Sequence, residues 1–169
     1  TTPYGASGSF QSQRKRECRT MGKLERQENK QILGMAYIEK IRNRLHKKNK
    51  NWLAIVCGET GSGKSYSAIS LAHSIAQDQN NVYIVFSPLE FLELIGSELL
   101  IKGDVIVFDE AGVGMSSREW YSIQNKLLGA VLQTFRNLNL AVIFTTPNLS
   151  FIDVQARKLF HTYIETDHL

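Results

Sequence analysis

The sequence has few of the features that mark secreted, membrane or metal-binding proteins. Its only two cysteines, Cys18 and Cys57, lie in different contexts and suggest neither a disulfide nor a metal site. No apolar run approaches the ~20 residues needed to span a bilayer, and no signal peptide begins the chain. His73, His161 and His168 show no ligand spacing with cysteines or carboxylates. We therefore expect a cytoplasmic protein without a membrane segment.

Composition is ordinary for a globular chain, but the charge is unevenly distributed. Apolar residues make up 43% and charged residues 21% of the 169 positions, which fits one domain with an extension. Residues 1–50 hold 13 of the 20 Lys/Arg and 4 of the 16 Asp/Glu, a balance of +9, whereas residues 51–169 carry −5. We expect a flexible tail at 1–20, a basic helical arm at 21–50 and a core at 51–169.

The basic arm has three possible roles. Charge of one sign on one segment favours a polyanionic partner, and nucleic acid is the expected one. The arm could instead dock on the acidic core of a neighbouring subunit, or it could simply be a solvated helix face.

A glycine-rich loop at residues 58–65 follows an apolar run, Trp52–Cys57, and precedes a segment with helical periodicity. Strand, loop and helix in this order are the context in which a Walker A motif binds phosphates through backbone N–H groups. Lys64 would reach the β- and γ-phosphates, and the Ser65 hydroxyl would bind Mg²⁺. We expect a nucleoside triphosphate to be bound by Gly58, Glu59, Thr60, Gly61, Ser62, Gly63, Lys64, Ser65 and Tyr66.

A second motif, four apolar residues followed by Asp109 and Glu110, has the pattern of a Walker B strand. Asp109 would hold Mg²⁺ opposite Ser65, and Glu110 would polarise the water that attacks the γ-phosphate. The alternative is a strand that ends in a solvated turn. No Asn-Lys-x-Asp run for reading guanine is present, which favours ATP.

Strand and helix patterns alternate, which predicts an α/β fold with a parallel sheet and helices on both faces. The Walker A and Walker B strands are separated by one whole strand–helix unit, so a further strand must lie between them, as in the RecA-like P-loop NTPase order 5-1-4-3-2. That strand, 140–145, would direct Thr145 and Thr146 toward the γ-phosphate, unless they are ordinary β-branched strand residues. The expected strands are 52–57, 81–86, 104–109, 140–145 and 161–165, preceded by a basic N-terminal helix.

These residues resemble the ASCE division of P-loop ATPases, in which a glutamate follows the Walker B aspartate. More narrowly, the chain looks like the FtsK/HerA superfamily and its zonula-occludens-toxin-like branch in viruses and mobile elements. The likeness covers residues 52–165. Its supporting segments are Val107–Gly112, Leu132–Arg136, Phe144–Pro147, Ile152–Asp153 and Arg157.

The resemblance implies an oligomeric DNA translocase or packaging motor that depends on ATP and Mg²⁺. Ring motors place an arginine of one subunit against the γ-phosphate of its neighbour, and Arg157, then Arg136, are the candidates here. A nucleotide-gated interaction protein, such as a helicase-loader-like switch, is the alternative. A small-molecule kinase is a third possibility, but Glu110 argues against it because kinases need an acceptor rather than a poised water.

Overall fold

The computed structural model describes residues 31–76, 78–110, 138–152 and 154–167. The chain divides into two compact units, residues 1–38 and 39–169, and the sheet belongs entirely to the second. Residues 31–46 are helical, within the arm predicted at 21–50, whose outer limits stay a prediction. Among the described residues, no helix combines the length and apolar character that crossing a bilayer requires.

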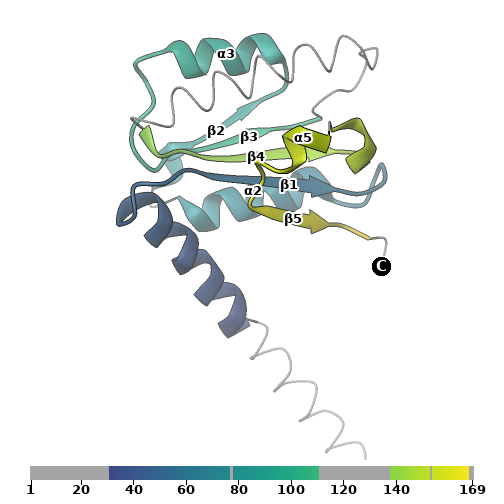
Figure 1. Ribbon diagram of the computed structural model, residues 1–169, viewed down its shortest axis with the longest axis horizontal. Coiled ribbons are helices and arrows are strands. Elements are labelled where there is room, and N and C mark those ends of the chain that lie inside the picture. Colours follow the sequence, from purple (N-terminus) through teal and green to yellow (C-terminus); the bar gives the residue numbers. More distant parts are fainter. Residues whose placement is uncertain (1–30, 77, 111–137, 153, 168–169) are drawn as a thin grey trace, which may run out of the picture. The chain divides into compact units, whose positions relative to one another are not determined.

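Five parallel strands form one sheet with the order β2-β3-β4-β1-β5 (Figure 1). This is the predicted 5-1-4-3-2 order read from the other edge, and the fold-class prediction is confirmed. The strand after the Walker B strand does pair between β1 and β3, as the spacing of the motifs required. The strands are β1 Trp52–Cys57, β2 Val82–Val85, β3 Val105–Phe108, β4 Ala141–Thr146 and β5 Thr162–Glu165.

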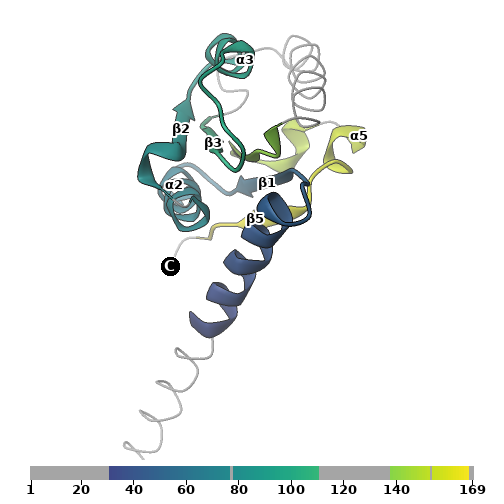
Figure 2. The ribbon, with the colours of Figure 1, turned by 90° about the vertical axis from the view of Figure 1, so that its left-hand side faces the viewer.

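Helices cover both faces of the sheet (Figure 2). On one face lies α2, Lys64–Ile75, which contacts β1, β3 and β4 and buries Ala68, Ala72 and Ile75. On the other face lie α3, Pro88–Gly96, and the short α5, Val154–Arg157. Short 3-10 turns, η1 Gln79–Asn81 and η2 Leu149–Phe151, precede β2 and follow β4.

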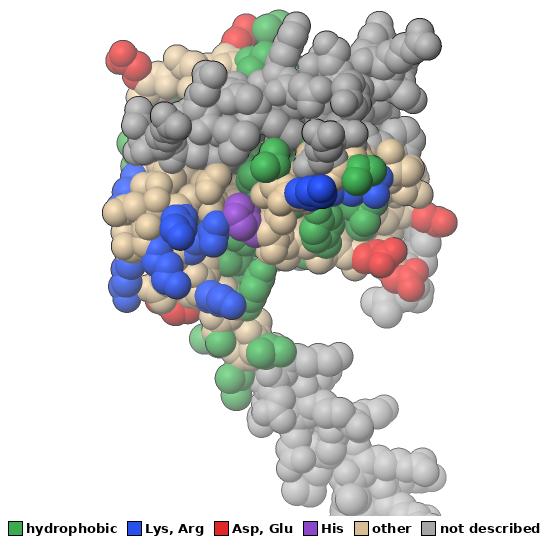
Figure 3. Space-filling view, in the orientation of Figure 1, with side chains coloured by type: hydrophobic (Ala, Val, Ile, Leu, Met, Phe, Trp, Pro, Cys, Tyr) green, Lys and Arg blue, Asp and Glu red, His purple; other side chains and the backbone are tan. Residues whose placement is uncertain are grey.

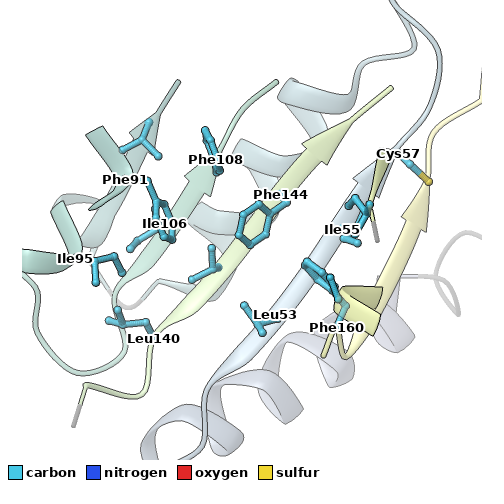
Figure 4. Close-up of a cluster of buried hydrophobic side chains, with 14 of the residues drawn as sticks. Leu53, Ile55, Cys57, Phe91, Ile95, Ile106, Phe108, Leu140, Phe144 and Phe160 are labelled. Carbon is cyan, nitrogen blue, oxygen red and sulfur yellow. The ribbon is translucent and has the colours of Figure 1, made fainter. Parts of the chain in front are cut away.

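An aromatic cluster fills the α3/α5 face of the core (Figure 4). The rings of Phe91, Phe108, Phe144 and Phe160 follow one another with centroid separations of 5.5–5.7 Å between Phe91 and Phe108, Phe108 and Phe144, and Phe144 and Phe160. Each of these phenylalanines is at most 8% exposed. Because β1, β3 and β4 are buried on both faces, they read as continuous apolar runs rather than alternating, except for the two threonines that end β4. Their carboxyl ends are held at one common edge.

The last turns of the N-terminal helix, from Glu39 on, belong to the second unit and pack within it. Ile41 and Leu45 are buried. The Arg42 guanidinium donates hydrogen bonds to the carbonyls of Ser74, Ile75 and Ala76 at the end of α2, at 2.8–3.3 Å. A cation is well placed there because the last carbonyls of a helix have no intrahelical donor and carry partial negative charge.

Candidate functional site

The loop between β1 and α2 forms one wall of a cavity at the carboxyl edge of the sheet. Gly63 precedes α2 with φ 81° and ψ 19°, the left-handed conformation that glycine adopts without a steric penalty. Lys64 Nζ donates to the Glu59 carbonyl at 2.7 Å, so its ammonium folds back over the loop. The cavity has a volume of about 550 Å³ and is lined by Thr60, Gly61, Gly63, Lys64, Ser65, Tyr66, Glu110 and Pro147.

The two predicted motifs meet at this cavity. Ser65 Oγ donates a 2.8 Å hydrogen bond to Asp109 Oδ1, although the two residues are 44 positions apart. Asp109 is buried at the end of β3, with 8% of its surface exposed, whereas Glu110 is exposed and lines the cavity. Because β1 and β3 are both neighbours of β4, their carboxyl ends lie close enough for this contact.

Thr145 joins the two carboxylate residues, a role that the sequence did not reveal. Its hydroxyl donates to Asp109 Oδ1 at 2.7 Å and accepts from the backbone N–H of Glu110 at 2.8 Å. Glu110 has φ 53°, an uncommon conformation for a residue with a side chain. Such backbone strain persists where surrounding contacts enforce it, and the Thr145 hydroxyl is one such contact.

Thr146 lies one residue further and makes a different contact. Its side chain is fully buried and its hydroxyl donates to the Asn148 carbonyl at 3.1 Å. Successive strand residues point to opposite faces, so Thr145 and Thr146 contact different neighbours, and neither lines the cavity. Thr146 is absent from the cavity lining, and its contact with nucleotide stays a prediction.

The arginine candidates differ in what the structure describes. Arg157 ends α5, and its Nε donates to the Ile152 carbonyl at 2.8 Å. It does not line the cavity of its own chain. Arg136 lies outside the described residues, as does the Leu132–Arg136 segment.

A second cavity of about 550 Å³ adjoins the loop where the carboxyl ends of β1, β4 and β5 meet. Burial, followed by the charge of Glu165, raises the pKa of the Cys57 thiol, so it stays protonated at neutral pH. The lining residues are Cys57, Gly58, Glu59, Pro147, Asn148, Leu149, Glu165, Thr166 and Asp167.

Comparisons with known proteins agree with the fold and with the resemblance inferred from the motifs. The family described as Zonular occludens toxin (Zot) matches residues 89–168, which include the Walker B strand but not the Walker A loop. An uncharacterized protein, B-251, of Sulfolobus spindle-shape virus 1 is 27% identical over 125 residues. That alignment covers 67% of this chain and 50% of the viral protein, so the chain spans about half the length of this curated relative.

Solved structures show the same fold at low sequence identity. A chain of the E. coli MS115-1 HORMA:CdnC:Trip13 complex gives a TM-score of 0.56 with 14% identity, over 80% of this chain and 62% of that one. C. elegans PCH-2 gives 0.58 with 17% identity, over 80% and 42%. A DNA polymerase III gamma subunit-related protein of Thermotoga maritima gives 0.54 with 10% identity, over 78% and 46%. The predicted resemblance to the zonula-occludens-toxin-like branch is confirmed over residues 89–168.

Proposed function

We propose that this chain, which has a P-loop ATPase fold and a region similar to the Zot family, binds ATP with Mg²⁺ and hydrolyses it. The observation that carries the proposal is a single cavity that joins the Walker A loop to Glu110, with Ser65 bonded to Asp109 beside it. A volume of about 550 Å³ lies within the ~300–1,000 Å³ typical of small-molecule sites.

The residues present suit a magnesium ion that arrives with its nucleotide. No cluster of three or more His, Cys, Asp or Glu that could hold a metal occurs in the described part of the chain. The hydroxyl of Ser65 and the carboxylate of Asp109 are oxygen donors of the kind Mg²⁺ prefers, and phosphate oxygens and water would complete the set. The ion would neutralise charge that develops on the phosphates during transfer.

The remaining steps belong to the protein. The loop N–H groups and the α2 N-terminus would bind the phosphates, and Lys64 would move from the Glu59 carbonyl to the γ-phosphate. Glu110 would orient the attacking water and accept its proton. Its exposed carboxylate is free to face the cavity because the backbone, not the side chain, is bonded to Thr145.

The protein is proposed to act as an oligomer. Hydrolysis in ring motors is completed by an arginine from the adjacent subunit, and Arg157 and Arg136 are the candidates for that contact. The viral relative supports a role in a virus or mobile element, in which a translocase or packaging motor would use this activity.

DNA is the proposed partner. The contacts of the basic arm indicate which of its cations are available to bind DNA phosphates. Arg42 binds the end of α2, and Arg44 donates to the Asn51 carbonyl at 2.6 Å and contacts His161, so both are engaged within the fold. Exposed cations gather at the amino ends of the strands, on the left in Figure 3. We call these the lysine cluster: Lys47, Lys48, Lys50 and Lys102.

The lysine cluster lies at the opposite edge of the sheet from the nucleotide cavity. Lys102 Nζ donates to the His46 carbonyl and to Asn49, which holds it beside the other three lysines. A six-residue strand such as β1 separates the two edges by roughly 20 Å. DNA bound at one edge would therefore influence hydrolysis at the other through the sheet rather than by direct contact.

ATP turnover with and without DNA, on a sample whose oligomeric state is measured by light scattering, tests the proposal. Glu110→Gln should lower turnover by about 10²–10⁴-fold while ATP still binds, because it removes only the general base. Undiminished turnover in that variant would remove Glu110 from its role. Hydrolysis that no DNA length stimulates would instead favour a nucleotide-gated interaction protein.

A further inference from the structure

The end of β5 is joined directly to the phosphate loop. β5 pairs with β1 up to Glu165 opposite Cys57, and the next residue, Thr166, continues this pairing with a 2.8 Å bond from its N–H to the Cys57 carbonyl. The Thr166 hydroxyl lies 3.2 Å from the same carbonyl and 2.7 Å from Ser62 Oγ. One residue thus contacts both the last residue of β1 and the middle of the loop.

The packing at Gly58 shows how close this approach is. A Cβ at position 58 would overlap the carbonyl and the hydroxyl oxygen of Thr166, and would lie 2.7 Å from Ser62 Oγ. Any larger residue would push the end of β5 away from the loop. The glycine at the start of the Walker A motif is therefore explained here by Thr166 as well as by the approach of phosphates.

Ser62 transmits this contact to the part of the loop that faces the cavity. Its N–H donates to the Glu59 carbonyl at 3.1 Å, and the same carbonyl accepts the Lys64 ammonium at 2.7 Å. The neighbours of Ser62 in the chain, Gly61 and Gly63, both line the cavity. Fixing the Ser62 side chain therefore restricts the backbone N–H groups that would cradle a phosphate.

We propose that Thr166 is a positioning residue that holds the phosphate loop in its nucleotide-binding conformation. The inference deepens the proposed function and rests on it. The hydroxyl restrains the loop before the ligand arrives, so less conformational freedom is lost on binding. Thr166 touches neither the phosphates nor the metal, and its effect on affinity passes through Ser62.

Two substitutions at position 166 distinguish the effect of the hydroxyl from the effect of the packing of β5. Thr166→Val keeps the shape and the backbone bond to Cys57 but removes the hydroxyl, whereas Thr166→Ser keeps the hydroxyl. Loss of the hydroxyl and its contacts with Ser62 and Cys57 predicts that Thr166→Val binds MgATP about 3- to 10-fold more weakly, and inorganic tripolyphosphate equally so, since only the loop is affected. Thr166→Ser should bind both within about twofold of wild type.

A double-mutant cycle with Ser62→Ala tests whether the Thr166 hydroxyl acts on affinity through Ser62. Titration calorimetry measures the affinities, and thermal unfolding checks that each variant folds. If the hydroxyl pair carries the effect, Ser62→Ala and Thr166→Val should weaken binding by similar factors, and the double variant no more than either alone. Wild-type affinity in Thr166→Val, or factors that multiply in the double variant, would overturn the inference. Absence of MgATP binding by the unmodified protein would instead refute the proposed function, and the inference with it.

Discussion

Ser65 and Asp109 share a 2.8 Å hydrogen bond, and Asp109 Oδ1 accepts a second one, of 2.7 Å, from Thr145. Two hydroxyls on neighbouring elements therefore fix one carboxylate oxygen. The orientation of the Asp109 carboxylate is set before any ligand binds, because α2 and β4 each contribute a donor. This gives Thr145 a role in the site that differs from sensing the γ-phosphate.

Thr145→Val should lower MgATP hydrolysis about 10- to 100-fold, because residues that orient a metal-binding carboxylate typically contribute that much. The Mg²⁺ concentration for half-maximal activity should rise in the same variant, since the Asp109 carboxylate loses a donor and Glu110 loses its backbone anchor. Steady-state turnover at varied Mg²⁺ measures both effects.

Thr145→Ser retains the hydroxyl and is the matched control, so it should keep most of the activity. Thermal unfolding of both variants checks that β4 still packs, because position 145 is fully buried. Equal activity in the valine and serine variants would mean that the hydroxyl does not orient Asp109.

The sequence was sufficient for the fold and for the meeting of the Walker A loop with Glu110 at one cavity, because Walker A and Walker B are local patterns with a fixed structural context. The contacts of Thr145 and Thr166, in contrast, could not be predicted from the sequence. Their contacts depend on how β4 and β5 are placed against their neighbours, and a shift of one residue exchanges the two faces of a strand. The sequence singled out Thr145 only as a candidate contact of the γ-phosphate, and it gave no signal for Thr166.

The buried carboxyl group of Asp104 should make the free energy of unfolding depend on pH. It is fully buried before β3, its Oδ2 accepts from the Ile101 N–H at 2.8 Å, and its Oδ1 has no partner among the described residues. Burial raises its pKa above the usual value of 3.8. The stability that the protonated carboxyl contributes is fully present below pH 3.8 and is lost as pH rises through the raised folded-state pKa.

Asp104→Asn removes this titration while keeping a similar shape. The free energy of unfolding of the variant, relative to wild type, should therefore increase between about pH 4 and pH 7, and urea denaturation at both pH values measures it. The difference increases with pH because burial destabilises the ionised carboxylate of the wild type, whereas the amide of the variant stays neutral. A stability difference that stays constant across this range would show that Asp104 does not titrate with a raised pKa.

Substitution of Tyr66 should separate recognition of the nucleotide base from recognition of the phosphates. The side chain is 80% exposed, follows Ser65 and lines the cavity, which is an unusual position for a large ring without a ligand. It also borders a groove along α2 formed by Ile69, Ser70, His73 and Ser74. Stacking on a base contributes about 1–3 kcal/mol, so Tyr66→Ala should weaken ATP binding by roughly fivefold or more.

Inorganic tripolyphosphate provides the comparison for Tyr66, because it has phosphates but no base. Its affinity should be the same in Tyr66→Ala and wild type, and Tyr66→Phe should behave as wild type toward both ligands. Equal losses for ATP and tripolyphosphate would assign the ring to the shape of the loop rather than to the base.

The lysine cluster predicts how DNA binding responds to salt. Each lysine that neutralises a phosphate of B-DNA contributes a slope of about −0.9 to the dependence of log affinity on log salt. Replacing Lys47, Lys48 and Lys50 with glutamine should therefore make the slope less steep by up to about 3. Binding should weaken without a change in sequence preference. Lys158→Gln, an exposed lysine just after α5, is the control for loss of a charge elsewhere. Fluorescence anisotropy with duplex DNA at several salt concentrations measures both, and an unchanged slope in the triple variant would show that DNA does not bind at this edge.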